Sequence, residues 1–235
     1  MTINSTKKAA RVAGLLYLAT CIPAPFSLLY VPGKLIVSGN AAATARNILA
    51  SEWMFRLGIA GQLVSAIAFL FAVRALHRLL QGVDKRLASL MVTLFAISIP
   101  ISCVNVLNDI AALILVRGAD FLSVFSEPQR QALAMVFLRL HSQGLLVAQI
   151  FWGLWLLPFG VLVYRSGFLP RILGVLLILN GCAYPIQSFT SFLLPQYASL
   201  IYRVTFPALT GELVVILWLL IRGARDEPLA RAAAA

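Results

Sequence analysis

Charged residues are scarce in this chain of 235 residues, since only 11% are Asp, Glu, Lys or Arg. A typical soluble domain has about 25%. Hydrophobic residues make up 61% of the sequence, and the mean hydropathy is +0.92. These values exclude a water-soluble globular fold. They also exclude a disordered chain and an ordinary nucleic-acid-binding protein, because both need polar, charged sequence. The composition predicts an integral membrane protein whose first partner is the lipid bilayer.

Residues and motifs that carry chemistry are also few. The three cysteines, Cys21, Cys103 and Cys182, lie in apolar runs, and their spacing matches no zinc or redox motif. The sequence contains no HExxH, GxSxG, Walker lysine or dinucleotide-binding glycine pattern. We therefore expect no disulfide, metal or cofactor, and neither an enzyme nor an ATP-driven transporter.

One protease resemblance is incomplete. Glu52–Arg56 has the ExxxR form and Phe137–His141 the FxxxH form found in membrane proteases that process prenylated proteins. The metal site of those proteases needs paired glutamates and a second histidine. The remaining histidine here, His77, is expected on the other side of the membrane. The resemblance therefore does not change the expectation that the chain is not an enzyme.

Six apolar stretches reach the length of about 20 residues needed to cross a bilayer as a helix. They are Ala9–Tyr30, Phe55–Leu80, Leu87–Val116, Ser142–Tyr164, Phe168–Leu194 and Phe206–Ile221. The prediction is an all-α polytopic protein with one six-helix transmembrane domain over residues 9–222. It lies between a cytoplasmic N-terminus, residues 1–8, and a disordered cytoplasmic tail, residues 223–235. Residues Leu18–Cys21 resemble a lipoprotein signal, but Thr20 is a poor residue before a lipidated cysteine, so we expect an uncleaved first helix.

The basic residues set the predicted orientation. With the N-terminus in the cytoplasm, twelve of the 19 Lys and Arg residues flank the spans on the inner side and seven on the outer side. Basic residues accumulate in cytoplasmic loops. We therefore expect both termini in the cytoplasm of a bacterium, in its inner (plasma) membrane. The net charge of +11 is explained in the same way, since inner loops face anionic lipid.

The two long outer loops are predicted to contain short helices. Asn40 is a suitable N-cap for a helix over Ala41–Ser51. Ser126 and Gln129 have the spacing of a capping box, which predicts either an interfacial helix or an outward extension of the fourth span. Prolines predict kinks in most spans, with Pro207 opening the last one.

The first and third helical hairpins share a weak pattern. Arg11–Gly14 and Gly61–Val64 in the first correspond to Arg171–Gly174 and Gly211–Val214 in the third. The pattern is consistent with a duplicated hairpin, although chance similarity is common in a chain this apolar.

Several stretches resemble a bacterial family of integral membrane proteins, domain-of-unknown-function family 4386. They are Ala10–Leu18, Ala43–Ile48 with Glu52 and Phe55–Arg56, Ala148–Leu154 and, most distinctively, Arg165–Gly174. Asn40 departs from the family pattern, which has an acidic residue there, so a cation site in that loop is not expected. The resemblance implies a six-helix inner-membrane protein and assigns no chemistry to any residue.

Two acidic residues, Asp109 and Glu212, lie inside predicted spans. An ionised carboxylate at mid-membrane costs about 2.5–3.5 kcal/mol on insertion scales, so such residues usually mark functional sites or are paired. Asn105 and Asn108 share a helix face with Asp109. The candidate ligand-binding residues are Asp109, Glu212, Asn105, Asn108, His141, Gln149 and Arg56.

These residues predict a polar pocket that opens outward and binds or transports a small or lipid-like ligand. The two carboxylates would hold a cation or proton, the asparagines would orient the ligand, and His141 or Arg56 would gate the mouth. Two alternatives stay open. The acidic residues could only fix helix packing, or the protein could be a non-catalytic partner that docks another membrane protein through small-residue faces, Ala10/Gly14 and Gly61/Ser65.

Overall fold

The computed structural model describes residues 3–224, and within this range the protein is helical with no strand. Six helical segments are long and apolar enough to cross a membrane, so the protein is a multi-pass membrane protein. They are Thr6–Leu35, Glu52–Leu80, Lys85–Arg117, Glu127–Arg165, Arg171–Leu193 and Pro195–Ile221. The prediction of six spans is confirmed. Most of the tail predicted to be disordered, residues 225–235, lies outside the described residues.

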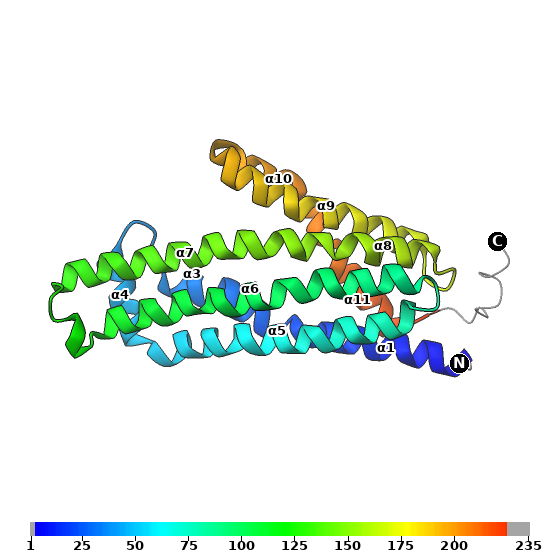
Figure 1. Ribbon diagram of the computed structural model, residues 1–235, viewed down its shortest axis with the longest axis horizontal. Helices are drawn as coiled ribbons and strands as arrows, with labels where there is room; N and C mark the ends of the chain where they lie inside the picture. The colour runs from blue at the N-terminus through cyan, green and yellow to red at the C-terminus, as the bar shows by residue number, and fades with distance from the viewer. Residues whose placement is uncertain (1–2, 225–235) are drawn as a thin grey trace. The chain divides into compact units, whose positions relative to one another are not determined.

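The chain divides into two compact units, each built from several separate segments. Unit 1 comprises Met1–Ala19, Ala68–Ile99 and Leu146–Ala235, and unit 2 comprises Thr20–Ile67 and Pro100–Leu145. Three long helices contribute to both units (Figure 1): α5 (Glu52–Leu80), α6 (Lys85–Arg117) and α7 (Glu127–Leu154).

Unit 2 contains the short elements that follow the first span. They are α2 (Pro23–Pro25), the π-helix η1 (Phe26–Tyr30), α3 (Val31–Leu35), α4 (Ala41–Ala50) and the 3-10 turn η2 (Asp120–Leu122). α4 packs against α3. The core of the unit is aliphatic, with Val31, Ile48, Leu113 and Leu138 buried around Phe55. A core of this composition holds the first half of α5 and the second half of α6 against α7.

Both predicted caps are present in unit 2. The Asn40 side chain accepts a hydrogen bond from the backbone N–H of Ala43 at 2.9 Å, and α4 follows at once. The backbone N–H of Ser126 donates to Gln129 Oε1 at 2.8 Å, as in a capping box. Because α7 runs without interruption from Glu127, this segment is an extension of the fourth span and not a separate interfacial helix.

Unit 1 contains α1 (Ile3–Thr20), α8 (Leu156–Arg165), α9 (Arg171–Leu193), the 3-10 turn η3 (Pro195–Tyr197), α10 (Ala198–Leu209) and α11 (Gly211–Ile221). Its centre is aromatic. Trp155 lies 5.6 Å from Phe69, 5.5 Å from Phe95 and 5.4 Å from Phe159, measured between ring centroids. Tyr17 of α1 joins this cluster through Phe69, at 4.9 Å.

Glycines bring α8 and α9 together. A Cβ atom on Gly174 would lie 2.6 Å from the Gly160 carbonyl oxygen, and one on Gly160 would lie 2.7 Å from the Gly174 carbonyl oxygen. At the end of α7, just before α8, Gly153 contributes in the same way, since a Cβ on Gly181 would lie 3.0 Å from its carbonyl oxygen. The two helices therefore contact through their backbones, a packing that small residues allow in membrane proteins.

The sixth span differs from the prediction. It begins with η3 and α10, so Pro207 lies inside α10 and does not open the span. The helix is interrupted a turn later at Thr210, and α11 begins at Gly211. Proline removes a backbone donor from the helix, and the Thr210 hydroxyl donates to the Pro207 carbonyl at 2.7 Å, which satisfies one acceptor at the break.

The predicted repeat is only partly visible in the elements. Arg11–Gly14 lies inside α1, whereas Arg171–Gly174 begins α9. Gly61 lies in the middle of the continuous helix α5, whereas Gly211 begins α11 after the interruption. The duplicated hairpin stays a prediction.

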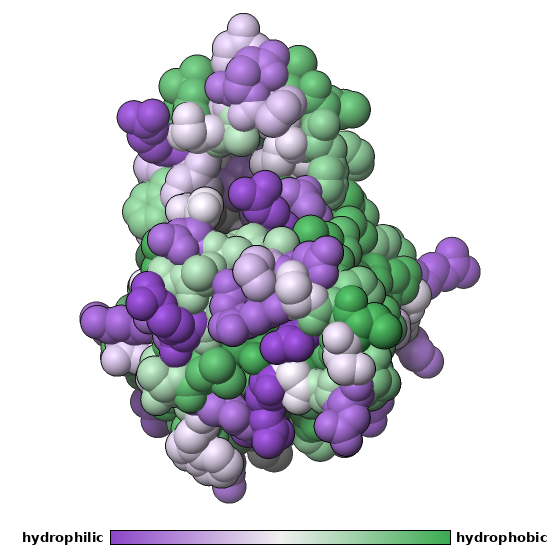
Figure 2. Space-filling model, turned by 90° about the vertical axis from the view of Figure 1, so that its left-hand side faces the viewer, coloured by the Kyte–Doolittle hydropathy of each residue, from purple (hydrophilic) through white to green (hydrophobic). Residues whose placement is uncertain are grey.

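Hydrophilic side chains gather on the end of unit 2 that carries α4 and the start of α7 (Figure 2). The exposed residues there include Arg46, Arg117, Asp120 and Glu127. Exposed apolar side chains lie among them, and Trp53 and Phe121 are each 73% exposed. A mixture of basic and aromatic residues is typical of a segment at the membrane–water interface.

Candidate functional site

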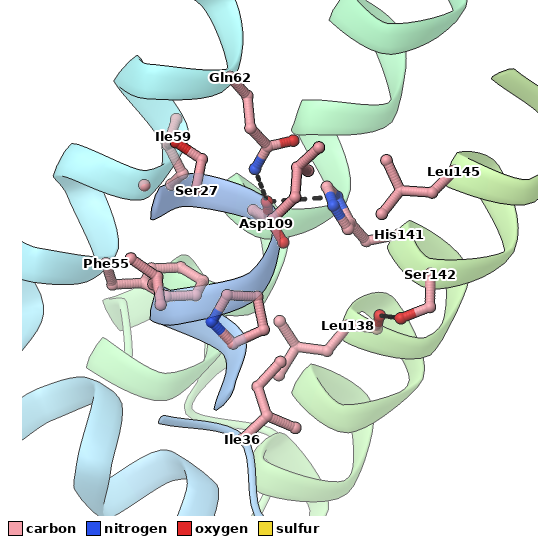
Figure 3. A pocket seen from close by; sticks show the side chains of 14 residues that line it. Ser27, Ile36, Phe55, Ile59, Gln62, Asp109, Leu138, His141, Ser142 and Leu145 are labelled. Atoms are coloured by element: carbon pink, nitrogen blue, oxygen red, sulfur yellow. Dashed lines mark hydrogen bonds and ion pairs between the residues drawn. The ribbon is translucent and has the colours of Figure 1, made fainter. Parts of the chain in front are cut away.

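A cavity of about 80 Å³ lies inside unit 2 (Figure 3). Its walls come from the π-helix η1, α3, α5, α6 and α7, and most of its lining is apolar, including Val31, Phe55 and Leu138. Five polar side chains also line it: Ser27, Gln62, Asp109, His141 and Ser142. No Lys or Arg is among its lining residues. The cavity therefore combines an apolar wall with one acidic group.

Asp109 is the centre of the polar wall. Gln62 Nε2 donates a hydrogen bond to Asp109 Oδ2 at 2.8 Å, and His141 Nδ1 lies 3.2 Å from the same oxygen (Figure 3). Asp109 is 6% exposed and His141 is 7% exposed. The three side chains come from three different helices, so the predicted grouping of Asp109 with His141 is present and also includes Gln62.

Asn105 and Asn108 form hydrogen bonds next to this group, outside the cavity. Asn105 is buried, and its Nδ2 donates to the backbone carbonyl of His141 at 2.9 Å. Asn108 Nδ2 donates to the carbonyl oxygen and to Oδ1 of Asn105, both at 3.1 Å. Neither asparagine lines the cavity. Asn105 joins α6 to α7 near His141, and Asn108 binds Asn105 within α6. Their role in orienting a ligand stays a prediction.

Glycine makes this junction possible. A Cβ atom on Gly144 of α7 would overlap the side-chain amide of Asn105, with Oδ1 the nearest atom. The amide therefore occupies the space that any other residue at position 144 would need.

Two buried polar atoms of the cavity lining have no hydrogen-bond partner among the described residues. They are Ser27 Oγ and His141 Nδ1, of which His141 Nδ1 still forms an ion-pair contact with Asp109 Oδ2 at 3.2 Å. Ser27 is 2% exposed and lies in the π-helix, a form that is frequent at functional sites. Buried polar atoms are nearly always paired, so Ser27 Oγ is the atom of this lining that lacks a partner among the described residues.

Arg56 lies outside this group. Arg56 Nε donates to Glu52 Oε1 at 2.7 Å, and Glu52 Oε2 lies 3.6 Å from Arg117 Nε. Arg56 is exposed and does not line the cavity. It forms part of a surface ion-pair group and has no contact with the predicted site.

Glu212 and Gln149 belong to unit 1 and to separate networks. Glu212 accepts hydrogen bonds from Tyr17, from Asn180 Nδ2 at 3.1 Å and from the Tyr184 hydroxyl at 3.2 Å. Gln149 Nε2 donates to Gln187 Oε1 at 2.7 Å. Asp109 and Glu212 therefore share no hydrogen-bond partner, and Glu212 does not line the Asp109 cavity.

Comparison with known proteins places the chain in a family. A family model described as "Domain of unknown function (DUF4386)" matches residues 12–223. The chain belongs to the DUF4386 family. It is also 38% identical over 74 residues to an uncharacterized protein of Archaeoglobus fulgidus, an alignment that covers 32% of this chain and 43% of that protein. The chain thus matches less than half the length of this relative. No solved structure matches the chain.

In this DUF4386 protein, sequence reasoning missed several site residues. Ser27 and Asn180 carry buried polar groups, and Tyr17 and Tyr184 bind Glu212. Asn180 could have been found, because an amide inside the apolar run of the fifth span is as unusual as the acidic residues. The hydroxyl residues carry no such signal, since Ser and Tyr are common in membrane helices.

Proposed function

We propose that this DUF4386 protein binds a small organic cation, such as a protonated short-chain amine, in the Asp109 cavity of unit 2. The observation that carries the proposal is that the buried residue Ser27, whose Oγ has no hydrogen-bond partner among the described residues, lines the same cavity as the buried pair of Asp109 and His141. An ammonium group has one positive charge and three N–H donors. It would compensate the carboxylate and can donate to the Ser27 hydroxyl oxygen.

The size of the cavity supports a small ligand. Drug-sized ligands occupy pockets of about 300–1,000 Å³, and an engineered cavity of about 150 Å³ accepts benzene. A cavity of about 80 Å³ has room for a group of a few heavy atoms. A lipid-like ligand would place only its head group there. The apolar lining at Val31, Phe55 and Leu138 suits a short alkyl chain on the nitrogen.

The experiment is a titration of the purified protein in lipid nanodiscs with methylammonium and ethylammonium, measured by calorimetry. Ethanol, which is neutral and similar in size to ethylammonium, is the ligand control. We expect Asp109→Asn to weaken ammonium binding by about 10- to 100-fold, because a hydrogen bond to a charged group contributes about 1.5–3 kcal/mol. The matched control is Glu127→Gln at the exposed start of α7, which should bind like the wild type.

Equal affinity for ethanol and ethylammonium would contradict the proposal, as would an Asp109→Asn variant that binds like the wild type. Uptake of labelled ethylammonium into proteoliposomes would then distinguish transport from binding alone. The proposed role is binding and not catalysis.

The alternative of a membrane partner protein would need a surface other than the small-residue faces first considered. A Cβ on Gly14 would lie 2.8 Å from the Leu220 backbone nitrogen of α11, so this face is covered within unit 1. Ala10 is 0% exposed and Ser65 is 9% exposed. A Cβ on Gly61 would overlap Ser27 Oγ. These contacts favour the binding proposal.

We further propose that the protein lies in the bacterial inner membrane with both termini in the cytoplasm. The support is the excess of basic residues on one side of the spans. Single cysteines introduced at Gln81 and at Ser123 in a variant lacking the native cysteines test the orientation. A membrane-impermeant maleimide added to intact cells should label position 123 and not position 81, and the reverse labelling would contradict the orientation.

A further inference from the structure

We propose that Glu212 in unit 1 is a proton-binding site that is built to hold its carboxyl group in both the charged and the neutral form. This inference is independent of the Asp109 cavity, because the two groups share no hydrogen-bond partner. It rests on the set of groups around Glu212 and on one buried atom that has no partner.

The groups that bind Glu212 are all uncharged. Tyr17 of α1 donates to Oε1, and Asn180 and Tyr184 of α9 donate to Oε2. Among the described residues, no Lys, Arg or His nitrogen forms an ion pair with Glu212. The titratable groups that face it are therefore the two tyrosines, with Tyr202 of α10 beyond Tyr184.

These donors and the helix end favour the carboxylate form. Three hydrogen bonds satisfy the anion, and Glu212 lies in the first turn of α11, where the helix dipole stabilises a negative charge. The membrane interior favours the neutral form instead, because an ionised carboxylate without a cationic partner is costly there. The two effects oppose each other at one residue, which is the condition for a group that exchanges a proton.

Asn180 provides for the neutral form. Its side chain is completely buried, and Oδ1 has no hydrogen-bond partner while Nδ2 of the same amide binds Glu212 Oε2. When a proton from water joins Oε2, it takes the lone pair that accepted from Nδ2, while the other lone pair still accepts from the Tyr184 hydroxyl. Rotation of the amide by half a turn then places Oδ1 where it accepts the new O–H.

The number of Asn180 side-chain atoms without a hydrogen-bond partner is therefore the same in the charged and in the neutral form of Glu212. In the charged form Oδ1 has no partner, and in the neutral form Nδ2 takes its place. If Oδ1 had a hydrogen-bond partner of its own, rotation of the amide would break that bond. The rotation would then be opposed, because leaving a buried polar group unsatisfied is costly. The unpaired oxygen of a completely buried asparagine is thus explained by a role in the protonated state.

The test is infrared spectroscopy of the full-length protein in nanodiscs at a series of pH values, with the carbonyl band of protonated carboxyl groups as the readout. The spectrum of Glu212→Gln is subtracted from that of the wild type. We expect a band that falls as pH rises and that is wholly lost in Glu212→Gln. Asp109→Asn, the matched control in unit 2, should keep this band even if the amine-binding proposal fails.

Asn180→Leu supplies a second measurement that keeps Glu212. It removes both amide groups at similar volume, so the Glu212 band should move to the higher frequency of an acid without an acceptor. A difference spectrum with no protonated carboxyl band at any pH would overturn the proposal, and so would a band that does not respond to pH. An unchanged band in a folded Asn180→Leu variant would overturn the role of Asn180.

Discussion

Gly144→Ala tests the packing that supports the candidate site. The new methyl group would take the place of the Asn105 amide, which then has to move. Movement breaks the hydrogen bond of Asn105 to the His141 carbonyl at 2.9 Å and the one it accepts from Asn108 at 3.1 Å. Side-chain hydrogen bonds in membrane proteins contribute about 0.6 kcal/mol each, and overpacking costs about 1–3 kcal/mol. We expect a loss of about 2–4 kcal/mol in unfolding free energy.

The assay is reversible unfolding in mixed micelles, compared with the matched control Gly33→Ala. Gly33 is in α3 of the same unit, and a Cβ there meets nothing within 4 Å, so this variant should be neutral or slightly more stable. Asn105→Ala should partly rescue Gly144→Ala, because it removes the colliding amide. Equal stability of the two glycine variants, or strict additivity of the double variant, would refute the reasoning.

Three further predictions concern packing and surface charge. Gly174→Ala should destabilise unit 1 by about 1–3 kcal/mol, because its Cβ would lie 2.6 Å from the Gly160 carbonyl oxygen. Thermal unfolding of this variant should show a lower midpoint. Asn40→Ala should cost about 1 kcal/mol through loss of the α4 cap, whereas Asn40→Asp should retain most of the stability in the same assay. Glu52→Gln should change stability by less than about 1 kcal/mol and leave amine binding unchanged, because its ion pair with Arg56 is on the surface and away from the cavity. A large loss of binding in Glu52→Gln would contradict the placement of Arg56 outside the site.

The membrane fold could be predicted from the sequence because long apolar runs have few alternatives to transmembrane helices. The six spans follow from these runs, and the Asn40 cap follows from local chemistry. The predicted start of the sixth span is wrong because a proline is typical of the first turn of a helix, whereas Pro207 lies inside α10. The preceding segment 198–206 is itself apolar enough to continue the helix through Pro207.

The candidate site was only partly predictable. Spacing along α6 predicts that Asn105 lies one turn before Asp109 on the same helix face, because it depends on one helix alone. Which helix faces Asp109 depends on how neighbouring helices are rotated, so the choice of Gln62 as its partner needed the structure. The same limit explains why Glu212 was expected beside Asp109, whereas its partners are Asn180 and tyrosines.

The orientation of Ser27 shows a further limit. Ser27 lines the cavity and lies in the segment after α2 that forms a π-helix, in which the Val31 N–H donates to the Phe26 carbonyl five residues earlier. Prolines at 23 and 25 remove backbone donors just before this segment. A sequence pattern indicates that a helix with these prolines is irregular, but it does not indicate which side chain the irregularity turns inward.

The most direct test of the central claim is a crystal structure of the protein grown from a lipid phase in the presence of ethylammonium. The account predicts additional density in the Asp109 cavity, with its nitrogen within hydrogen-bond distance of Asp109 and of Ser27 Oγ, and no such density in Asp109→Asn. A cavity that holds only water at saturating ethylammonium, with the same density in the variant, would contradict the claim that this site binds a small cation.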